Sequence, residues 1–302
     1  MGKVLKMLLI SLLLISILSL PIALGCNGDK ADTSGELSQL ELEQILTDSI
    51  TAINQVNTYG MNADMGIFMD IRGGGEEGTM DMDMTMEGYI DQTSMDMYML
   101  MDLYLAMDIG FEAGSEDMTI DMYMVDDYLY MKMDIPELGE EWIKMPATDE
   151  TMSAYDLDMV SEQLAILESP GELNYLRDEI LDGSDCYVIQ MIPDLAAIMD
   201  WIGDQGLADL GLDWEDVGVI RDMFDELTYT IWIDKETKYI KKMTAYILMK
   251  MSGDDFADMD GDIGTITMDM NMDIEMYDYN KPVTIVLPDE ALDAMEFGDF
   301  GF

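Results

Sequence analysis

The chain has 302 residues, of which 49% are hydrophobic, so it carries enough apolar side chains to build a sizeable folded core. Its 64 acidic and 14 basic residues give a formal net charge of −50, which excludes nucleic acid as a partner because a phosphate backbone requires a basic surface. The chain contains no His, which excludes Ser–His–Asp and Cys–His catalysis, and we expect no enzyme.

Residues 1–25 are typical of a signal peptide. Lys3 and Lys6 precede the apolar stretch "MLLISLLLISILSL", which is too short to cross the hydrocarbon core of a membrane. The stretch ends in "PIALGC", which is similar to the lipobox of lipoproteins except that Ala23 stands where leucine is usual. Cleavage before Cys26 is therefore expected, and it exposes Cys26 for lipid attachment. Ordinary signal peptidase would cut the same bond, so Cys26 is either lipidated or merely exposed by cleavage.

These alternatives determine the state of the second cysteine. If Cys26 is lipidated, the protein is extracytoplasmic and anchored to the cell membrane, and Cys186 in "SDCYVIQMI" is a lone buried thiol. If Cys26 is not lipidated, a Cys26–Cys186 disulfide becomes possible.

A polar tether over residues 26–35 leads into a predicted helix. The helix is indicated by a stripe of side chains at three- and four-residue steps. The stripe consists of Leu42, Ile45, Leu46, Ser49, Ile50, Ile53 and Val56.

Long strands with strict alternation follow the helix. Every second residue is apolar, and most often methionine, in "MNADMGIFMDI", "GTMDMDMTMEGYI", the segment 94–111 and "MTIDMYM". The intervening positions are largely acidic, and "GGGEEG" and "EAGSED" read as turns. This period of two places one side of a sheet on a core and the other in water, and the short turns predict an antiparallel meander. "YLYMKM" and "EWIKM" predict two further strands.

The middle of the chain, 148–227, changes character. "DETMSAYDLDMVSEQLAILESPGELNYLRDEILDG" has helical spacing, broken at Ser169–Pro170 and ended by Gly183. "CYVIQMI" predicts a strand, followed by the helices "PDLAAIMDWIGDQ" and "DWEDVGVIRDMFDEL". Strands resume at "TYTIWIDKETKYIKKMTAYILMKM", with a hairpin turn at 234–237, and again at 265–277. We predict a single α+β domain over 36–294, followed by a disordered tail at 295–302.

The inward methionines have three interpretations. They form an ordinary core, or an adaptable cavity for a hydrophobic ligand, because methionine is flexible and fills irregular space. Thioethers also bind Cu(I), and the acidic loop "DMDGDIG" (258–264) carries aspartates at calcium-loop spacing without the required glycine. We expect no resident cofactor and no defined metal ligands.

Several segments together resemble the LolA/LppX-type lipoprotein-carrier superfamily. They are the lipobox-like start, the helix leading into "INQVNTYGMNADM", "YLYMKM" with "EWIKM", the hairpin "YTIWIDKETKYIKKM" and the closing "YNKPVTIVLPDEA". The resemblance implies a half-barrel, a large curved antiparallel sheet with helices covering its concave face. It also implies carriage of lipids or acyl chains outside the cytoplasm, and no catalytic residue.

We therefore expect a monomeric, membrane-tethered lipoprotein that binds a lipid or another hydrophobic small molecule. The alternative is a surface interaction or sensor module with a filled core and an acidic outer face, and the third is Ca or Cu(I) binding. The predicted cavity is lined by Met65, Met82, Met84, Met97, Met99, Met101, Met122, Met243, Met270 and Met272.

Overall fold

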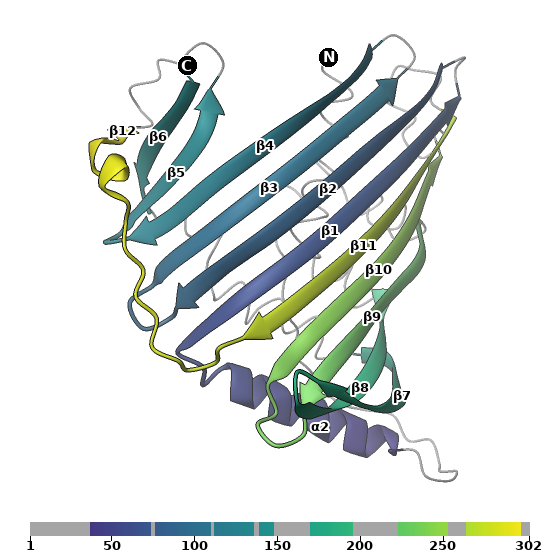
Figure 1. Ribbon diagram of the computed structural model, residues 1–302. Helices are drawn as coiled ribbons and strands as arrows, with labels where there is room; N and C mark the ends of the chain where they lie inside the picture. The colour runs from purple at the N-terminus through teal and green to yellow at the C-terminus, as the bar shows by residue number, and fades with distance from the viewer. Residues whose placement is uncertain are drawn as a thin grey trace.

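One large open sheet dominates the computed structural model (Figure 1). The structure describes residues 37–73, 76–109, 112–135, 139–147, 170–195, 223–252 and 264–296. The sheet has 12 strands in the order β12-β6-β5-β4-β3-β2-β1-β11-β10-β9-β8-β7. All neighbours are antiparallel except the two-residue β12, which runs parallel to β6. The predicted antiparallel sheet is confirmed, and it is not closed.

The elements follow the chain as a meander, a second set of hairpins and a returning strand. The meander consists of β1 (Thr58–Gly73), β2 (Glu76–Asp91), β3 (Asp96–Ile109), β4 (Glu112–Val125), β5 (Tyr128–Ile135) and β6 (Gly139–Pro146). The second set consists of β7 (Pro170–Leu181), β8 (Ser184–Pro193), β9 (Phe224–Asp234) and β10 (Ile240–Ser252). The chain ends with β11 (Thr265–Tyr277), a 3₁₀ helix (Asp289–Asp293) and β12 (Met295–Glu296). The pairing of β11 with β1 joins the two halves of the sheet.

The alternating sequence explains the long strands and their two different faces. In β1 the odd positions Ala63, Met65, Ile67 and Met69 are buried, whereas Asp64 is exposed. The same alternation holds in β2, now at the even positions, where Met80 is buried between the exposed Thr79 and Asp81. One face of the sheet is thus apolar and the other polar, as predicted.

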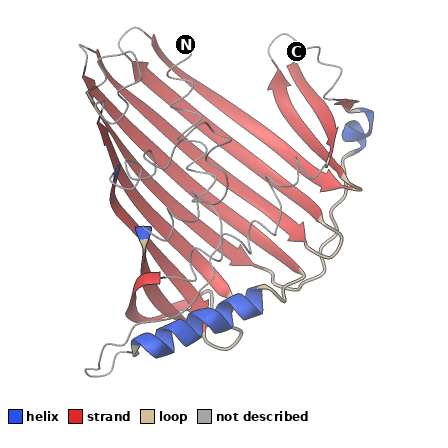
Figure 2. Ribbon diagram, turned by 180° about the vertical axis from the view of Figure 1, so that it is seen from behind, coloured by secondary structure: helices blue, strands red, loops and turns tan. Residues whose placement is uncertain are grey.

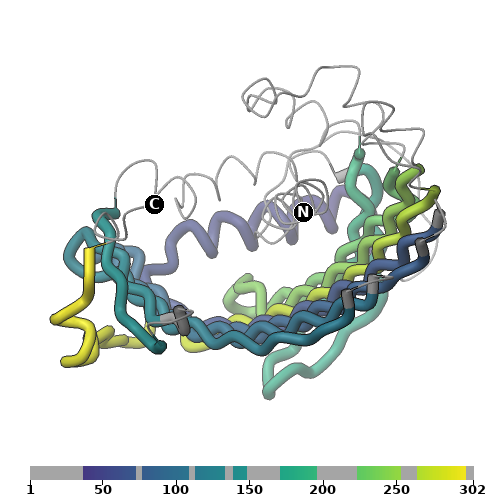
Figure 3. Tube along the Cα trace, turned by 90° about the horizontal axis from the view of Figure 1, so that it is seen from above, coloured from purple at the N-terminus to yellow at the C-terminus, as the bar shows by residue number. Residues whose placement is uncertain are grey.

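The helix α2 (Gln39–Ile53) lies on the concave side of the sheet, across one end of the strands (Figures 2 and 3). It begins at a capping box, in which the Ser38 backbone N–H donates to the Glu41 carboxylate (2.9 Å) and the Glu41 N–H donates to the Ser38 hydroxyl. Leu42 and Leu46 are each 2% exposed and pack into the main hydrophobic core. The predicted helix and its stripe from Leu42 to Ile53 are therefore confirmed, whereas Val56 lies beyond the end of the helix.

The helical reading of 170–183 was wrong, because these residues form β7 and its hairpin with β8. Leu181 pairs with Ser184, and the two residues between them have positive φ, 48° at Asp182 and 83° at Gly183. This Asp-Gly pair is a two-residue hairpin loop and not a helix end. The remainder of that predicted segment, 149–169, lies outside the described residues.

Three other boundaries also differ from the sequence prediction. "EAGSED" (112–117) is not a turn but the first half of β4, paired with β3. The helix predicted over 213–227 is replaced at 224–227 by the start of β9, and 213–222 lies outside the described residues. Met295 and Glu296, placed in the predicted tail, pair with β6 as β12. One helix, α2, is seen to cover the concave face within the described part of the chain, so the predicted helical cover is confirmed only in part.

Candidate functional site

The concave face of the sheet carries rows of methionines that lie directly opposite one another on neighbouring strands. Met65 in β1 pairs with Met84 in β2 on one side and with Met272 in β11 on the other. Directly opposed side chains in a sheet have Cβ atoms about 4.5–5.5 Å apart, so these thioether chains contact one another. We call this surface the methionine face. It comprises Met65, Met69, Met80, Met82, Met84, Met97, Met99, Met101, Met122, Met243, Met249, Met268, Met270 and Met272.

The methionine face is fully buried over β10, β11 and β1. Met243, Met249 and Met270 are at most 1% exposed, and they belong to the main core together with Leu46 of α2. Ile231 of β9 and Ile189 of β8 extend this core, and both are 0% exposed. This half of the face is packed like an ordinary protein interior.

Over β2 and β3 the same face becomes half-buried. Met82 and Met84 lie against the edge of the main core, and Met99 and Met101 continue the row on β3. A second buried cluster, consisting of Met97, Met122, Met124 and Leu129, lies further along, on β3 to β5. The half-buried methionines thus form a strip between two buried clusters.

The predicted cavity residues fall into three groups by their position. Met65, Met243, Met270 and Met272 are buried in the main core, with Met82 and Met84 at its edge. Met97 and Met122 are buried in the second cluster, with Met99 packed against it. Met101 lies between the two and pairs with Met86 and Ile120. All ten residues share the concave face, but whether they enclose one cavity stays a prediction.

Two polar groups are buried beside the main core. Tyr229 is 6% exposed, and burial raises the pKa of its phenol well above the ordinary value. Ser49 on α2 is 1% exposed, and its hydroxyl has no hydrogen-bond partner among the described residues. A buried hydroxyl without a partner carries a desolvation cost, so Ser49 is expected to lower the stability of the fold.

Cys186 is a buried free thiol at 0% exposure, as expected for the strand "CYVIQMI". Burial raises the pKa of the thiol, with a smaller contribution from the nearby Asp234 carboxylate. The burial and the raised pKa both make the Cys186 thiol poorly reactive, because the thiolate is the reactive form. Cys26, the predicted site of lipid attachment, lies outside the described residues.

Within the described ranges, no three His, Cys, Asp or Glu side chains are close enough together to hold a metal ion. The aspartates of the acidic loop at 258–263 lie outside these ranges.

None of the helices in the described part of the chain is both long enough and apolar enough to cross a membrane.

The sequence analysis missed a hollow of about 590 Å³ on the opposite, polar face of the sheet. It lies over β2, β1, β11, β10 and β9, around Gly66. The residues that shape it come from segments far apart in the chain. Only the strand order and register reveal that they are neighbours.

Comparison with solved structures finds mycobacterial lipoproteins. The lipoprotein LppX from Mycobacterium tuberculosis is 11% identical over 82% of this chain and 100% of that chain, with a TM-score of 0.41. LprF from Mycobacterium bovis is 15% identical over 84% of this chain and 99% of that chain, with a TM-score of 0.42. The resemblance to LppX-type proteins is thus found again among solved structures. Identities and TM-scores this low leave the ligand to be argued from the residues of this chain.

None of the curated proteins matches the sequence. The sequence model of a family of unknown function (DUF6612) matches residues 41–296, which is most of the chain, and the chain therefore belongs to that family.

Proposed function

We propose that this protein is an exported lipoprotein, tethered to the cell membrane through Cys26, that binds a lipid-like hydrophobic ligand on the methionine face. The observation that carries the proposal is the uneven burial of that face. Met65, Met243, Met270 and Met272 are buried on β1, β10 and β11, whereas Met82, Met84, Met99 and Met101 in the middle of β2 and β3 are only half-buried.

Half-buried methionines on a concave surface suit a ligand of variable shape. Methionine has an unbranched, flexible side chain, and several in a row can adjust around different acyl chains. Each methylene that such a ligand buries contributes roughly 0.8 kcal/mol, so an acyl chain that covers this strip would be retained. Polar residues on the other face keep the outer surface in water.

The buried half of the face supports the alternative, an interaction module with a filled core. In that case the half-buried strip is only the thin margin of an ordinary core, and no lipid accompanies the protein. Co-purification therefore separates the two functions directly.

The test is native mass spectrometry of the full chain extracted from the membrane of the cells that produce it. We expect a bound mass beyond the covalent anchor, identified as a lipid after organic extraction. Two variants on the same strand locate the site, because Leu100 and Met101 are both half-buried but point to opposite faces of β3. Met101→Lys places a charge on the methionine face and should remove the bound lipid. Leu100→Lys, which faces Glu87 and Asp121, should retain it.

Circular dichroism shows whether both variants are folded. A wild-type protein without bound lipid would overturn the proposal and favour the filled core. Equal lipid occupancy in the two folded variants would show that the ligand does not use the methionine face.

A further inference from the structure

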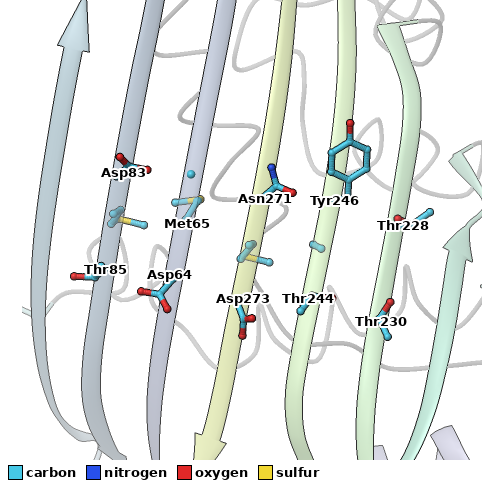
Figure 4. A pocket seen from close by; sticks show the side chains of 14 residues that line it. Asp64, Met65, Asp83, Thr85, Thr228, Thr230, Thr244, Tyr246, Asn271 and Asp273 are labelled. Carbon is cyan, nitrogen blue, oxygen red and sulfur yellow. The ribbon is translucent and has the colours of Figure 1, made fainter. Parts of the chain in front are cut away.

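The hollow lies on the polar face, on the side of the sheet away from α2, although Met65, Met84 and Met272 of the methionine face are also among its lining residues. Figure 4 shows its polar side chains, which come from five neighbouring strands. Neighbouring strands are about 4.8 Å apart, so five strands span about 19 Å across the sheet. The hollow is therefore an elongated trough that crosses the strands.

The trough lies over two adjacent rows of the polar face in which most side chains are short, with Tyr246 as the exception. In one row Thr244 lies opposite Thr230, and in the next Gly66 has no side chain while Thr228 pairs with Tyr246. A Cβ at Gly66 would meet only the Asp83 carboxylate, at an ordinary 3.4 Å, so no tight backbone packing requires glycine here.

Rows of larger side chains border the trough on both sides. On one side Lys242 pairs with Trp232, and the Lys242 ammonium lies 5.9 Å from the centre of the indole ring. On the other side Phe68, 45% exposed, lies at the level of Leu248, and both pair with Asp269. The floor and both walls thus belong to regular strands, so the shape of the trough is fixed by the sheet register.

Three carboxylates line the trough. Asp273 forms an ion pair with Lys242 at 2.6 Å. Asp64 and Asp83 have neither an ion pair nor a hydrogen bond with any of the described residues. None of the 14 lining residues is Lys or Arg, so an anionic ligand would be repelled.

The other polar groups of the lining can both donate and accept hydrogen bonds. Asn271 donates to the Asp269 carboxylate (3.1 Å), which leaves its amide oxygen free to accept. The threonine hydroxyls donate or accept, and the Tyr246 ring offers an apolar surface next to them. The two oxygens of a free carboxylate can each accept a hydrogen bond. Such a carboxylate can therefore bind two neighbouring hydroxyl groups on the ring of a cyclic ligand.

From this lining we infer that the trough binds a neutral carbohydrate, a short glycan lying across strands β2 to β9. A sugar chain is uncharged, elongated and rich in hydroxyl groups that both donate and accept, and its C–H faces pack on an aromatic ring. A lipid would leave the carboxylates buried without partners, and a phosphorylated ligand would be repelled by them. This site is independent of the lipid-like ligand, because it uses the opposite face of the sheet.

Isothermal titration of the full chain with neutral cello-, chito- and malto-oligosaccharides tests the inference. At least one series is expected to bind the wild-type protein. Asp83→Ala should weaken that binding tenfold or more, whereas Asp81→Ala should not. Asp81 is the matched control because it is exposed on the same face of β2, two residues along and outside the trough.

Gly66→Val provides a second variant that should fold, because valine is favoured in strands and a Cβ at position 66 would meet only the Asp83 carboxylate, at an ordinary 3.4 Å. It should fill the trough and abolish glycan binding without lowering the melting temperature.

Binding of spermidine but of no saccharide would overturn the inference in favour of a cation site. Binding of neither ligand would also overturn the inference. Equal loss in Asp81→Ala and Asp83→Ala would also overturn it. Lipid occupancy should be unchanged in Asp83→Ala, so failure here does not affect the proposed function.

Discussion

The Tyr277 ring lies across Gly60 of the neighbouring strand, where a Cβ would come within 2.4 Å of its Cε2 atom. Two interactions hold the ring in place. Its hydroxyl donates a hydrogen bond to the Asn62 side-chain oxygen at 3.0 Å, and it packs edge-on against Tyr89 with 5.8 Å between ring centres. Gly60 is thus a glycine because an aromatic ring occupies the space of its missing side chain.

Gly60→Ala should therefore lower the free energy of unfolding by about 1–3 kcal/mol, because the ring must move and lose one or both contacts. The measurement is urea unfolding followed by tryptophan fluorescence. Gly114→Ala is the control, since a Cβ there meets nothing within 4 Å and should be neutral or slightly stabilising. Equal stability of the two variants would contradict the proposed role of the ring.

Substitution of single methionines by alanine should lower stability much more in the buried half of the methionine face than at its margin. Met270 is 0% exposed, so Met270→Ala should cost about 2–5 kcal/mol through lost burial and the cavity left behind. Met118 on β4, which lies opposite Leu103 on β3, is 41% exposed, so Met118→Ala should change stability by about 0.5 kcal/mol or less. Chemical denaturation of both variants gives the comparison. A small loss in Met270→Ala would mean that the neighbouring methionines repack into the space.

The buried tyrosines predict a loss of stability at alkaline pH. Burial raises the pKa of Tyr59 to about 12, against a smaller lowering by its hydrogen bond with Gln92, and burial also raises the pKa of Tyr277 to about 12. The unfolded chain titrates near pH 10, so it releases these protons first. Their stabilising contribution is complete below about pH 10 and is lost as the pH rises towards 12.

Melting temperatures measured across this range should fall steeply, and Tyr59→Phe should reduce the fall. The matched control is Tyr104→Phe at a tyrosine that is 38% exposed, and it should leave the fall as steep as in the wild type. A pH profile of Tyr59→Phe identical to that of the wild type would show that Tyr59 ionises without unfolding.

Ser49→Ala should raise stability by about 1 kcal/mol in the ligand-free protein. The substitution removes a buried hydroxyl that has no partner among the described residues, and alanine is the better helix former. Ser38→Ala on the same helix should have the opposite effect, a loss of about 1 kcal/mol, because it removes the capping box. Thermal melts of the two variants measure the expected gain and the expected loss of stability. A loss of stability in Ser49→Ala would indicate that the hydroxyl is satisfied by a bound molecule.

The long strands and their two faces were predictable because one pattern governs them. From Met61 to Ile71 in β1 and from Met80 to Met86 in β2, every second residue is apolar, and a shift by one residue would expose every methionine among them. Because of this strict requirement, the sequence alone predicted that Met65, Met84 and Met272 lie on the apolar face of the sheet. The cross-strand partners were not readable, since register depends on which strands are neighbours.

The error at β7 has a definite physical cause. Leu173, Leu176 and Ile180 are spaced as on one side of a helix, but only Leu173 is buried, while Leu176 and Ile180 are 43% and 67% exposed. An edge strand needs few inward apolar residues, and pairing with β8 outweighs the local preference. The trough on the polar face was not predictable for a similar reason, since Gly66 on β1 and Thr230 on β9 line the same hollow only because the returning strand β11 joins the two halves of the sheet.

The two edge strands of this open sheet determine whether copies of the protein pair with one another and aggregate. At one end β12 is only two residues long, too short a template for a further strand. At the other end β7 departs twice from regular register, and its outer rim carries charges such as the ion-paired Arg177 and Glu179. The irregular register and the charged residues at these edges hinder edge-to-edge pairing of copies into fibres. The protein can therefore be present at a high local concentration without aggregating, although it is rich in long strands.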